Sequence, residues 1–490
     1  MMDDRFPSPQ PSPHGGARET FGFAALAMMV LCVGGCSLIG PNYFRPKAPV
    51  PTEYKEMAGW KQAEPRDHEI RGKWWEIYGD PALDALQEQV VVSNQTLAQA
   101  EARYRQSRAL VAQARAAYFP LVDLTASTGR SRSTGNVTVS RGSVTANNVG
   151  IDAAWEPDFW GRIRRTVEAN VASAQASAAD LESVKLSLHA DLAQNYFALR
   201  ALDAQQQLLE DSVGAFEASL KLTQNRYNAG VVARADVVQA QSQLRATQAQ
   251  AIDVGVQRAQ LEHAIAVLVG KAPSEVVLER APLAAAPPPV PVGVPSQLLE
   301  RRPDIASAER RVAAANAQIG FARAAYFPAI TLTASGGLRP SNLGELFATS
   351  TRFWSLGAAL AQTLFDAGAR RARTDQAVAL FDEASAAYRQ TMLTGFQEVE
   401  DNLAALRILE QESEVQAEAL ASSRLSVELA LNQYKAGIVS YLTVLTAQTT
   451  ALANERTAVD LRSRRLSASV LLIRALGGGW DAARLAAAPK

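Results

Sequence analysis

Short stretches in which every second residue is apolar alternate along the chain with very long helical stretches. The short ones lie at Val149 to Trp155, at Ile330 to Ser335 and at Trp354 to Leu360, and a fourth follows Pro120. A period of two is typical of a β-strand with one apolar and one polar face. We therefore expect four strands, arranged as two pairs far apart in the sequence.

A long helix is expected after each strand pair. Behind Gly161 and Gly368 the chain continues without proline for 67 residues, from Arg162 to Asn228 and from Ala369 to Lys435. At 1.5 Å per residue each helix would be about 100 Å long. In the first helix, apolar residues recur at steps of three and four or their sums, as in a coiled-coil seam. The seam consists of Leu181, Val184, Leu188, Leu192, Leu199, Leu202, Leu209, Val213, Phe216 and Leu220.

Two shorter helices complete this arrangement. We expect them at Arg234 to Gly270 and at Ser93 to Ala117. At 1.5 Å per residue their lengths are about 55 Å and about 37 Å. Laid end to end, the two helices come close to the length of one long helix. The lengths predict a long helix flanked by two shorter ones that stack on each other.

The chain is an internal duplication. The heptapeptide Ala114 to Pro120 returns at Ala322 to Pro328, 208 residues later, and Tyr227-Asn-Ala-Gly230 returns as Tyr434-Lys-Ala-Gly437, 207 residues later. Two independent matches at nearly one offset indicate two copies of a unit of about 200 residues. A proline-rich segment, residues 281–295, joins the copies and is unfavourable for helix.

The start of the chain has the features of a leader for export. The apolar stretch Phe21 to Val33 has thirteen residues, fewer than the ~20 of a membrane-spanning helix. Small residues then precede Cys36, as in a bacterial lipobox, so we expect Cys36 to become the lipidated first residue and Cys32 to be removed. A plain signal peptide is the alternative. The long stretch before Phe21 contains prolines and acidic residues, and it leaves a downstream start codon open.

Composition and charge argue against an enzyme and against a nucleic-acid partner. The 490 residues include 49 Lys plus Arg and 49 Asp plus Glu, so the chain is formally neutral and has no basic footprint. Phosphate-binding loops and the nucleophile elbow are absent. The four histidines are too scattered for a metal site, and His189 and His263 stand alone within helices. We expect no cofactor and no metal.

Four strands cannot close a barrel. If the strands lie in a membrane, the sheet edges need partners, because lipid offers no water to unpaired backbone groups. Two copies would give eight strands with a filled interior, whereas three copies would give twelve strands and a lumen. The pattern therefore favours a trimeric pore, and strands of a soluble sandwich are the alternative.

Several motifs along the mature chain resemble those of one known family. They are Gly40-Pro41-Asn42-Tyr43 behind the lipobox, Trp74-Trp75 with Tyr78-Gly79-Asp80-Pro81, Leu298-Leu-Glu-Arg-Arg-Pro-Asp304 with Ala308-Glu309, Ala314-Ala315 and Ile319-Gly320, and the terminal Ala475-Leu-Gly-Gly-Gly-Trp480. The chain resembles the TolC/OprM-like outer-membrane factors, in particular the NodT lipoprotein group.

The resemblance implies an architecture and a set of partners. It implies a mixed α and β membrane protein: a homotrimer with a twelve-stranded outer-membrane barrel, four strands per chain, a long periplasmic α-helical barrel and a mixed equatorial domain. The channel would be the exit duct of a tripartite export system. Its partners would be a periplasmic adaptor, an inner-membrane efflux pump of RND type and the lipid of the outer membrane.

With the family's architecture, the chain divides into six parts. These are a signal peptide (1–35), a lipidated N-terminal segment with an equatorial part (36–92), a first repeat (93–280, strand pair about 118–160), a linker (281–300), a second repeat (301–476, strand pair about 326–367) and a tail (477–490). The alternative to an exit duct is a structural periplasmic coiled-coil lipoprotein that resembles an adaptor. An adaptor would have one helical hairpin, whereas this chain has two.

The turns of the two helical hairpins are the candidate functional site. Glycine at a helix C-terminus supplies positive φ, which suffices to explain Gly230 and Gly437. In the resembling family these turns contact the adaptor and form the closed gate. The resemblance carries a gate role to Asp236, Tyr434, Leu442, Thr443 and Thr446, and a docking role to Tyr227, Gly230 and Gly437. Family members often carry aspartates where Thr443 and Thr446 stand.

Two arginine-rich helix starts complete the candidates. The first turns of the long helices contain Arg162, Arg164 and Arg165, and again Arg370, Arg371 and Arg373. Cations are unfavourable at a helix N-terminus, so we expect these residues to meet lipid phosphates, with a solvated face as the alternative. In Arg301-Arg302-Pro303-Asp304, proline and the acid indicate a helix start in the equatorial belt rather than a contact site.

Overall fold

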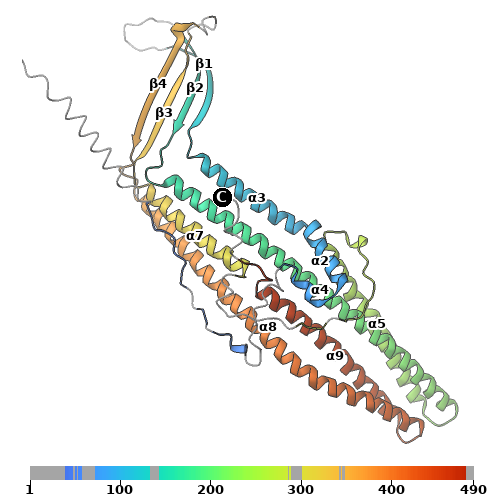
Figure 1. The fold of residues 1–490 in the computed structure, drawn as a ribbon. Coiled ribbons are helices and arrows are strands. Elements are labelled where there is room, and N and C mark those ends of the chain that lie inside the picture. Colours follow the sequence, from blue (N-terminus) through green and yellow to red (C-terminus); the bar gives the residue numbers. More distant parts are fainter. Residues whose placement is uncertain are drawn as a thin grey trace, which may run out of the picture. The chain divides into compact units, whose positions relative to one another are not determined.

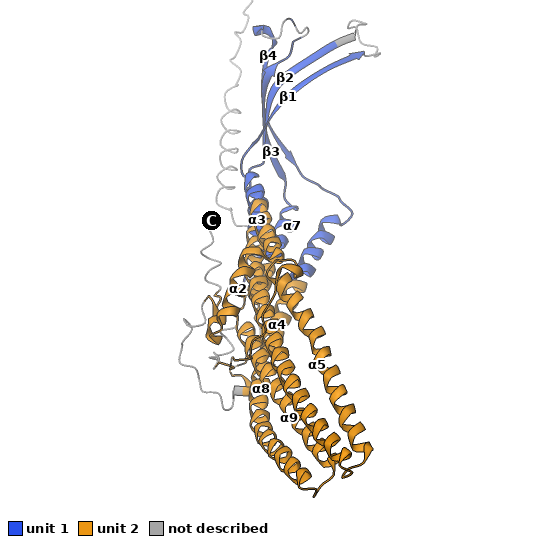
Figure 2. Ribbon diagram, turned by 90° about the vertical axis from the view of Figure 1, so that its right-hand side faces the viewer, with its two compact units in different colours: residues 1–44, 111–170, 314–381 blue, residues 45–110, 171–313, 382–490 orange. Residues whose placement is uncertain are grey.

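The structure is a computed structural model, and its chain forms two compact units (Figures 1 and 2). It describes residues 39–47, 50–51, 53–57, 72–132, 143–284, 286–288, 301–340, 344 and 348–481. Unit 1 comprises Met1–Phe44, Val111–Asn170 and Ala314–Phe381, and unit 2 comprises Arg45–Leu110, Val171–Ala313 and Asp382–Lys490, as far as these are described. Both units take residues from both sequence repeats, so the compact units do not coincide with the repeats.

Unit 1 contains a single four-stranded antiparallel sheet. The strands are β1 (Leu121–Arg132), β2 (Ser143–Trp155), β3 (Ala329–Leu338) and β4 (Arg352–Ala361), in the order β1-β2-β3-β4. All four expected strands are present, and the two pairs share one sheet because β2 pairs with β3. The outer edges of β1 and β4 have no partner strand within the described chain.

The register gives the sheet two different faces. Ala153 pairs with Ala334, which pairs with Leu356, and the neighbouring positions on this face are also apolar. The opposite face carries a transverse polar row, in which adjacent strands contribute Asp123, Asp152, Ser335 and Ser355. The hydroxyl of Thr125 donates to Oδ2 of Asp152 at 2.7 Å.

The long helices begin as the sequence predicted. Helix α4 (Arg162–Asn228) follows Gly161 at φ 78°, and α8 (Ala369–Lys435) follows Gly368 at φ 90°. An aspartate caps each start: Asp158 accepts from the backbone N–H groups of Ile163 and Arg164, and Asp366 accepts from those of Gly368 and Arg370. These carboxylates supply the negative charge that the N-terminal end of a helix favours.

The other helices have the following bounds. They are α2 (Pro81–Ser93), α3 (Gln95–Ala116), α5 (Arg234–Leu268), α7 (Pro303–Ala324) and α9 (Tyr441–Ala475), with short 3-10 turns η1 (Lys55–Met57), η2 (Trp74–Tyr78), η3 (Pro273–Glu275) and η6 (Thr349–Thr351). The boundary between the units falls inside α3, α4, α7 and α8. None of the helices among the described residues is long and apolar enough to cross a membrane.

Two expectations about the shorter helices need correction. The helix expected from Ser93 is preceded by α2, which was not predicted from the apolar pattern, and Asn94 separates the two. Asn94 is extended, and its side-chain oxygen accepts from the N–H of Leu97 at 2.9 Å, so it ends one helix and caps the next. Helix α5 ends at Leu268, two residues before the predicted Gly270, which lies at φ 71°.

The core of unit 2 follows the predicted seam of α4. Leu202, Leu209 and Phe216 are buried against Leu244 of α5 and Leu452 of α9. The other seam positions are buried or half-buried. Three helices from two repeats thus share one apolar core along the second half of the seam.

Candidate functional site

The turn between α4 and α5 ends α4 in a Schellman motif. Gly230 lies at φ 72°; its N–H donates to the carbonyl of Tyr227, and the N–H of Val231 donates to that of Arg226. The Tyr227 side chain is exposed. Asp236 lies half-buried in the first turn of α5, where a carboxylate suits the helix dipole.

The turn between α8 and α9 has the same construction. Gly437 lies at φ 79°; its N–H donates to the carbonyl of Tyr434, and the N–H of Ile438 donates to that of Gln433. Behind the turn, Leu442, Thr443 and Thr446 are exposed, and Leu442 has 54% of its surface accessible. The Thr446 hydroxyl donates to the carbonyl of Leu442 at 2.9 Å.

Tyr434 has a different position from the other candidate gate residues. Its ring is 1% exposed and packs against Tyr441, with ring centroids 5.8 Å apart, in a cluster that includes Ala240 and Val444. Burial, and then the neighbouring Tyr434 and Asp236, raise the pKa of Tyr441 to about 12. Tyr434 therefore lies inside the chain, whereas Leu442, Thr443 and Thr446 face outward.

Arg226 joins the two turns. Its guanidinium lies 4.6 Å from the centroid of the Tyr434 ring and donates to the carbonyls of Tyr434 at 2.5 Å and Lys435 at 3.2 Å. A cation from α4 thus caps the C-terminal end of α8. The sequence patterns do not predict a role for Arg226. The equivalent position in the second repeat, 207 residues later, is Gln433, so a comparison of the repeats would have marked it as different.

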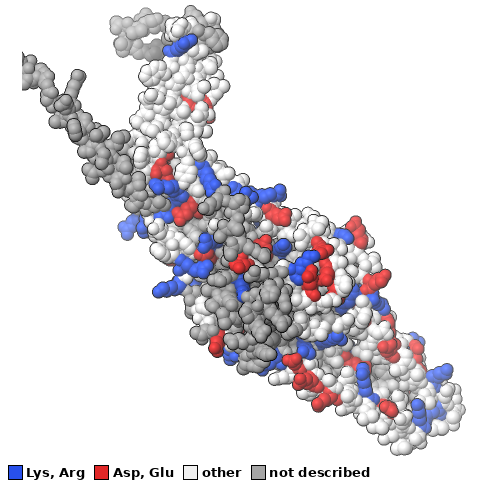
Figure 3. Space-filling view, viewed as in Figure 1, with Lys and Arg blue, Asp and Glu red and all other residues white. Residues whose placement is uncertain are grey.

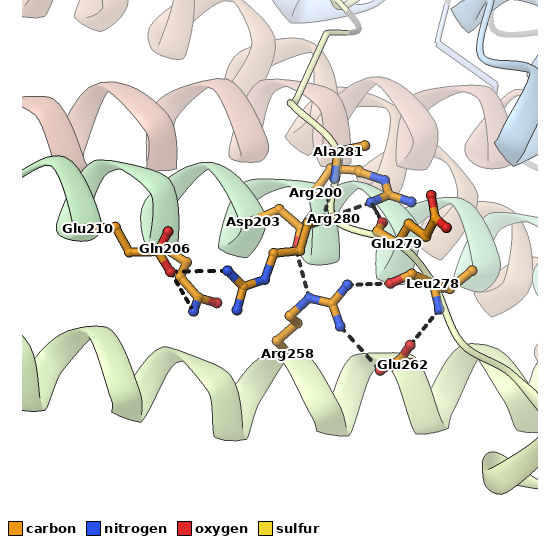
Figure 4. A network of polar contacts seen from close by, with 10 residues as sticks. All are labelled: Arg200, Asp203, Gln206, Glu210, Arg258, Glu262, Leu278, Glu279, Arg280 and Ala281. Carbon is orange, nitrogen blue, oxygen red and sulfur yellow. Dashed lines mark hydrogen bonds and ion pairs between the residues drawn. The ribbon is translucent and has the colours of Figure 1, made fainter.

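A second polar network lies further along the α4–α5 hairpin (Figure 4). Asp203 accepts from Arg200 and from Arg258, each at 2.7 Å, and its side chain is 2% exposed. Arg200 also donates to the carbonyl of Glu279, and Arg258 to that of Leu278. The network ties the segment that follows α5 to both helices of the hairpin.

The second repeat has a looser version of this network. The equivalent residues, each 207 positions later, are Arg407, Glu410 and Arg465. Arg465 donates to Glu410 at 3.2 Å, and Arg407 donates to Glu56 of the N-terminal segment. The Glu410 side chain is 64% exposed, so this pair is far more open to water than its counterpart.

A cavity of about 510 Å³ in unit 2 is lined by Trp74, Trp75, His189 and Trp480, among others. The His189 ring stacks on Trp75 at 4.3 Å, and Gln87 uses its amide N–H to bond the carbonyl of His189. The Gln87 oxygen therefore faces Nδ1, so Nδ1 carries the proton. Burial, and then Lys185, lower the pKa of His189 to about 4, which keeps the ring neutral. His263 is exposed.

The helix-start arginines do not behave as one group. Arg162 pairs with Glu156, Arg164 with Asp158 and Arg370 with Asp366. Arg165 is 1% exposed, so the expectation that it meets lipid phosphates is wrong. Arg371 and Arg373 are exposed.

The expected helix start at Pro303 is confirmed, and Arg302 directly before it contacts other helices of the chain. Arg302 is buried and donates to Asp304 and Glu398, each at 2.6 Å, and to the carbonyl of Ala475 at 3.1 Å. The position combines a helix start with a link to two other helices.

Two remaining expectations concern acylation and metal. Cys36 and the leader lie outside the described residues. Among the residues that the structure describes, no group of three His, Cys, Asp or Glu side chains is arranged to hold a metal ion.

The comparisons with known proteins agree on one family. The model of the outer membrane efflux protein family matches the chain twice, over residues 86–271 and 294–478. The matches begin 208 residues apart and end 207 apart, the offsets of the internal duplication. The solvent efflux pump outer membrane protein SrpC of Pseudomonas putida is 34% identical over 466 residues, which cover 94% of this chain and 99% of that protein. The pyoverdine export outer membrane protein OpmQ of Pseudomonas aeruginosa is 32% identical over 469 residues, covering 94% and 98%.

Solved structures give the same picture. The outer-membrane channel OprN superposes with a TM-score of 0.85 at 31% identity and covers 90% of this chain and 99% of that one. The open state of the outer-membrane channel MtrE of Neisseria gonorrhoeae has a TM-score of 0.81 at 27% identity, covering 91% and 99%. The similarity spans nearly the whole described chain.

Proposed function

The chain belongs to the outer membrane efflux protein family, and from this premise we propose that three copies close one channel that works with a periplasmic adaptor and an inner-membrane pump of RND type. The function of the chain is transport: it is the outer-membrane channel of an efflux system. The proposal concerns the number of copies, the partners and the residues that act.

The open sheet carries the proposal of a trimer. Each of the edge strands β1 and β4 has backbone groups on one side without a partner strand within the described chain. In lipid these groups must be paired, so β4 of one copy must meet β1 of the next. Eight strands would enclose a filled interior and twelve a lumen, and a duct needs the lumen. The apolar face of the sheet, with Ala153, Ala334 and Leu356, supports its placement in lipid, and few charged side chains lie on the face of the sheet that is visible in Figure 3.

Cysteine crosslinking tests the copy number. A cysteine on β1, at Thr125, is combined with single cysteines at successive β4 positions such as Ser355, Leu356 and Gly357. Acylation of Cys36 and removal of Cys32 would leave no other thiol in the mature chain. We expect at least one pair to give crosslinked dimers and trimers under mild oxidation. If the crosslinked products include dimers but no trimers, or if no cysteine pair gives a crosslinked product, the trimer is contradicted.

The two helical turns are our proposed gate and adaptor site. Leu442, Thr443 and Thr446 are exposed on one chain and are available to line the axis, while Tyr227 is available to the adaptor. The buried Tyr434 acts from inside by holding the turn together with Arg226. Gly230 and Gly437 shape the turns through their positive φ.

Substitution of Gly437 tests adaptor docking. A β-branched residue is strained at φ 79°, so Gly437→Val should distort the turn and reduce crosslinking to the adaptor. Gly214→Ala within α4 is the control, because nothing lies within 4 Å of the added carbon. Undiminished crosslinking of Gly437→Val would count against this docking surface.

Lipidation at Cys36 and the choice of cargo complete the proposal. Cys36→Ala should abolish incorporation of radioactive palmitate while trimers still form, and label on the variant would exclude this residue. The relatives are named for toluene, solvents and pyoverdine. Because such different compounds pass through similar channels, we assign the selection of cargo to the pump.

A further inference from the structure

The segment directly behind the lipobox is fixed to unit 1 by one buried arginine. Arg165 donates through Nε to the carbonyl of Ile39 and through Nη2 to that of Gly40, both at 3.2 Å, and to Oδ1 of Asn42 at 3.4 Å. Its charge is balanced by Glu168, at 2.7 Å from Nη1. A guanidinium that is 1% exposed thus directs two of its three nitrogens to this segment.

Two residues of α7 complete the seat. Asn316 donates its amide to the carbonyl of Pro41 at 3.0 Å. Gly40 lies at φ 100°, and a Cβ there would come within 2.4 Å of the Cα of Gly320. A Cβ on Gly320 would in turn come within 2.7 Å of Nε of Arg165. The backbone of the N-terminal segment therefore contacts the backbone of α7 at Gly40 and Gly320, and the Arg165 side chain lies beside this contact.

The internal duplication offers two equivalent places for such a seat, but the chain has the three residues at only one of them. Arg165 belongs to the first repeat, and Asn316 and Gly320 belong to the second; the positions equivalent to these three hold Ala372, Arg108 and Ala112. The start of α4 does not by itself explain Arg165, because α8 starts in the same way with Ala372 at the equivalent position.

We propose that Arg165, Asn316 and Gly320 form an anchor socket, which fixes the acylated N-terminus to the channel. The proposal rests on acylation of Cys36. Cys36 is three residues before Ile39, so at most about 11 Å of chain separates their Cα atoms. The lipid is thereby tethered at a defined place on unit 1, beside the start of α4, instead of through a long free segment. Arg165, Asn316 and Gly320 act as positioning residues for the anchor.

A nitroxide probe tests whether the socket holds the segment. Phe44 has 82% of its surface exposed and is a suitable position for a single labelled cysteine. We expect restricted motion of the probe in the otherwise wild-type trimer and clearly greater mobility in Arg165→Ala. Arg162→Ala is the control, because Arg162 is bonded to Glu156 and not to the segment. Unchanged mobility in Arg165→Ala would overturn the socket.

A double-mutant comparison tests the role in anchoring. Trimer yield in outer membranes is measured for wild type and Arg165→Ala, each in an acylated form and in a form exported behind a leader that directs no acylation. We expect Arg165→Ala to lower the yield of the acylated form several-fold, toward the reduced yield of the unacylated form. It should cause little loss in the unacylated form, because the socket then has no anchor to position. Equal fold losses in both forms, or no loss in either, would overturn the proposal.

Two further measurements separate the possible failures. If Arg165→Ala does not fold by circular dichroism, Asn316→Ala takes its place, since it removes only the bond to Pro41. Palmitate labelling is followed in every variant. Absence of label from wild type would overturn acylation and the anchor role with it. Label retained in Arg165→Ala, together with the loss of trimer, would assign the defect to positioning.

Discussion

Single arginines link helices of unit 2 to one another. Arg226 reaches from α4 to the last carbonyls of α8, and Arg302 reaches from the start of α7 to α8 and α9. Arg302 is buried and Arg226 is half-buried, and both direct guanidinium N–H groups at backbone carbonyls of another helix, so each favours one mutual arrangement of helices. Hydrophobic periodicity contains no signal for such contacts, because it describes one helix at a time.

His189 should make stability depend on pH. Its pKa is about 4 in the folded chain and near the ordinary 6.5 when unfolded, so between these values the unfolded state binds more protons. The stability is complete above pH 6.5 and falls as the pH drops toward 4. We expect a loss of about 2 kcal/mol per chain between pH 7.5 and 5. His189→Phe should remove this part of the acid sensitivity in denaturant titrations, and an unchanged pH dependence would refute the assignment.

Leu442 tests the gate. On one chain its side chain is 54% exposed, so it is not packed between helices of that chain. If three copies meet on the axis, they form an apolar constriction that blocks ions by excluding water. Leu442→Ala trimers in planar bilayers should then conduct several-fold more than wild type. Leu425→Ala is the control, because Leu425 is similarly exposed on α8 but distant in sequence from the turn. Equal conductance of the two variants would contradict the gate.

At the scale of elements, the helices and strands could be predicted largely from the sequence. The bounds of α4 and α8 agree because a glycine with positive φ precedes each helix and a glycine turn follows it. Helix α2 was missed because its separation from α3 depends on one asparagine cap, not on a break in the apolar pattern. The candidate turns were located through the duplication, but the burial of Tyr434 depends on packing between hairpins.

The duplicated networks allow a matched test of a buried ion pair. Asp203→Asn leaves Arg200 and Arg258 without their shared carboxylate in a site closed to water, which should cost about 3–5 kcal/mol. Glu410→Gln changes the equivalent but exposed acid and should cost less than about 1 kcal/mol. Chemical denaturation compares the two variants. A similar cost for both would show that burial does not decide the strength of these networks.

At the scale of the whole molecule, the duplication explains both the fold and its exceptions. Each repeat supplies two strands and one long hairpin, and the four strands pair into one sheet. The repeats differ at residues that make a contact which occurs only once in the described chain. The N-terminal segment has its seat at Arg165 of one copy, and the bridge between the turns is Arg226 of one copy. Comparison of the copies therefore locates special residues without any related sequence.

The two faces of the sheet are predicted to meet different surroundings in the trimer, one lipid and the other the water-filled lumen. Leu356 and Ser355 are neighbours in the middle of β4, both exposed on a single chain, and their side chains point to opposite faces. Leu356 shares its face with Ala153 and Ala334, while Ser355 contacts Ser335 in the polar row. In a closed trimer the first face meets lipid and the second lines the lumen.

Arginine substitutions at these two positions should therefore have different effects. Leu356→Arg places a charge toward lipid and should cost about 2–4 kcal/mol per chain near the middle of the bilayer, so heat-resistant trimers should largely disappear from the membrane. Ser355→Arg should leave the trimer intact and lower its cation conductance, because the new charges lie in the water-filled lumen. The reverse result, with Ser355→Arg lost and Leu356→Arg assembled, would mean that the polar face of the sheet points toward lipid.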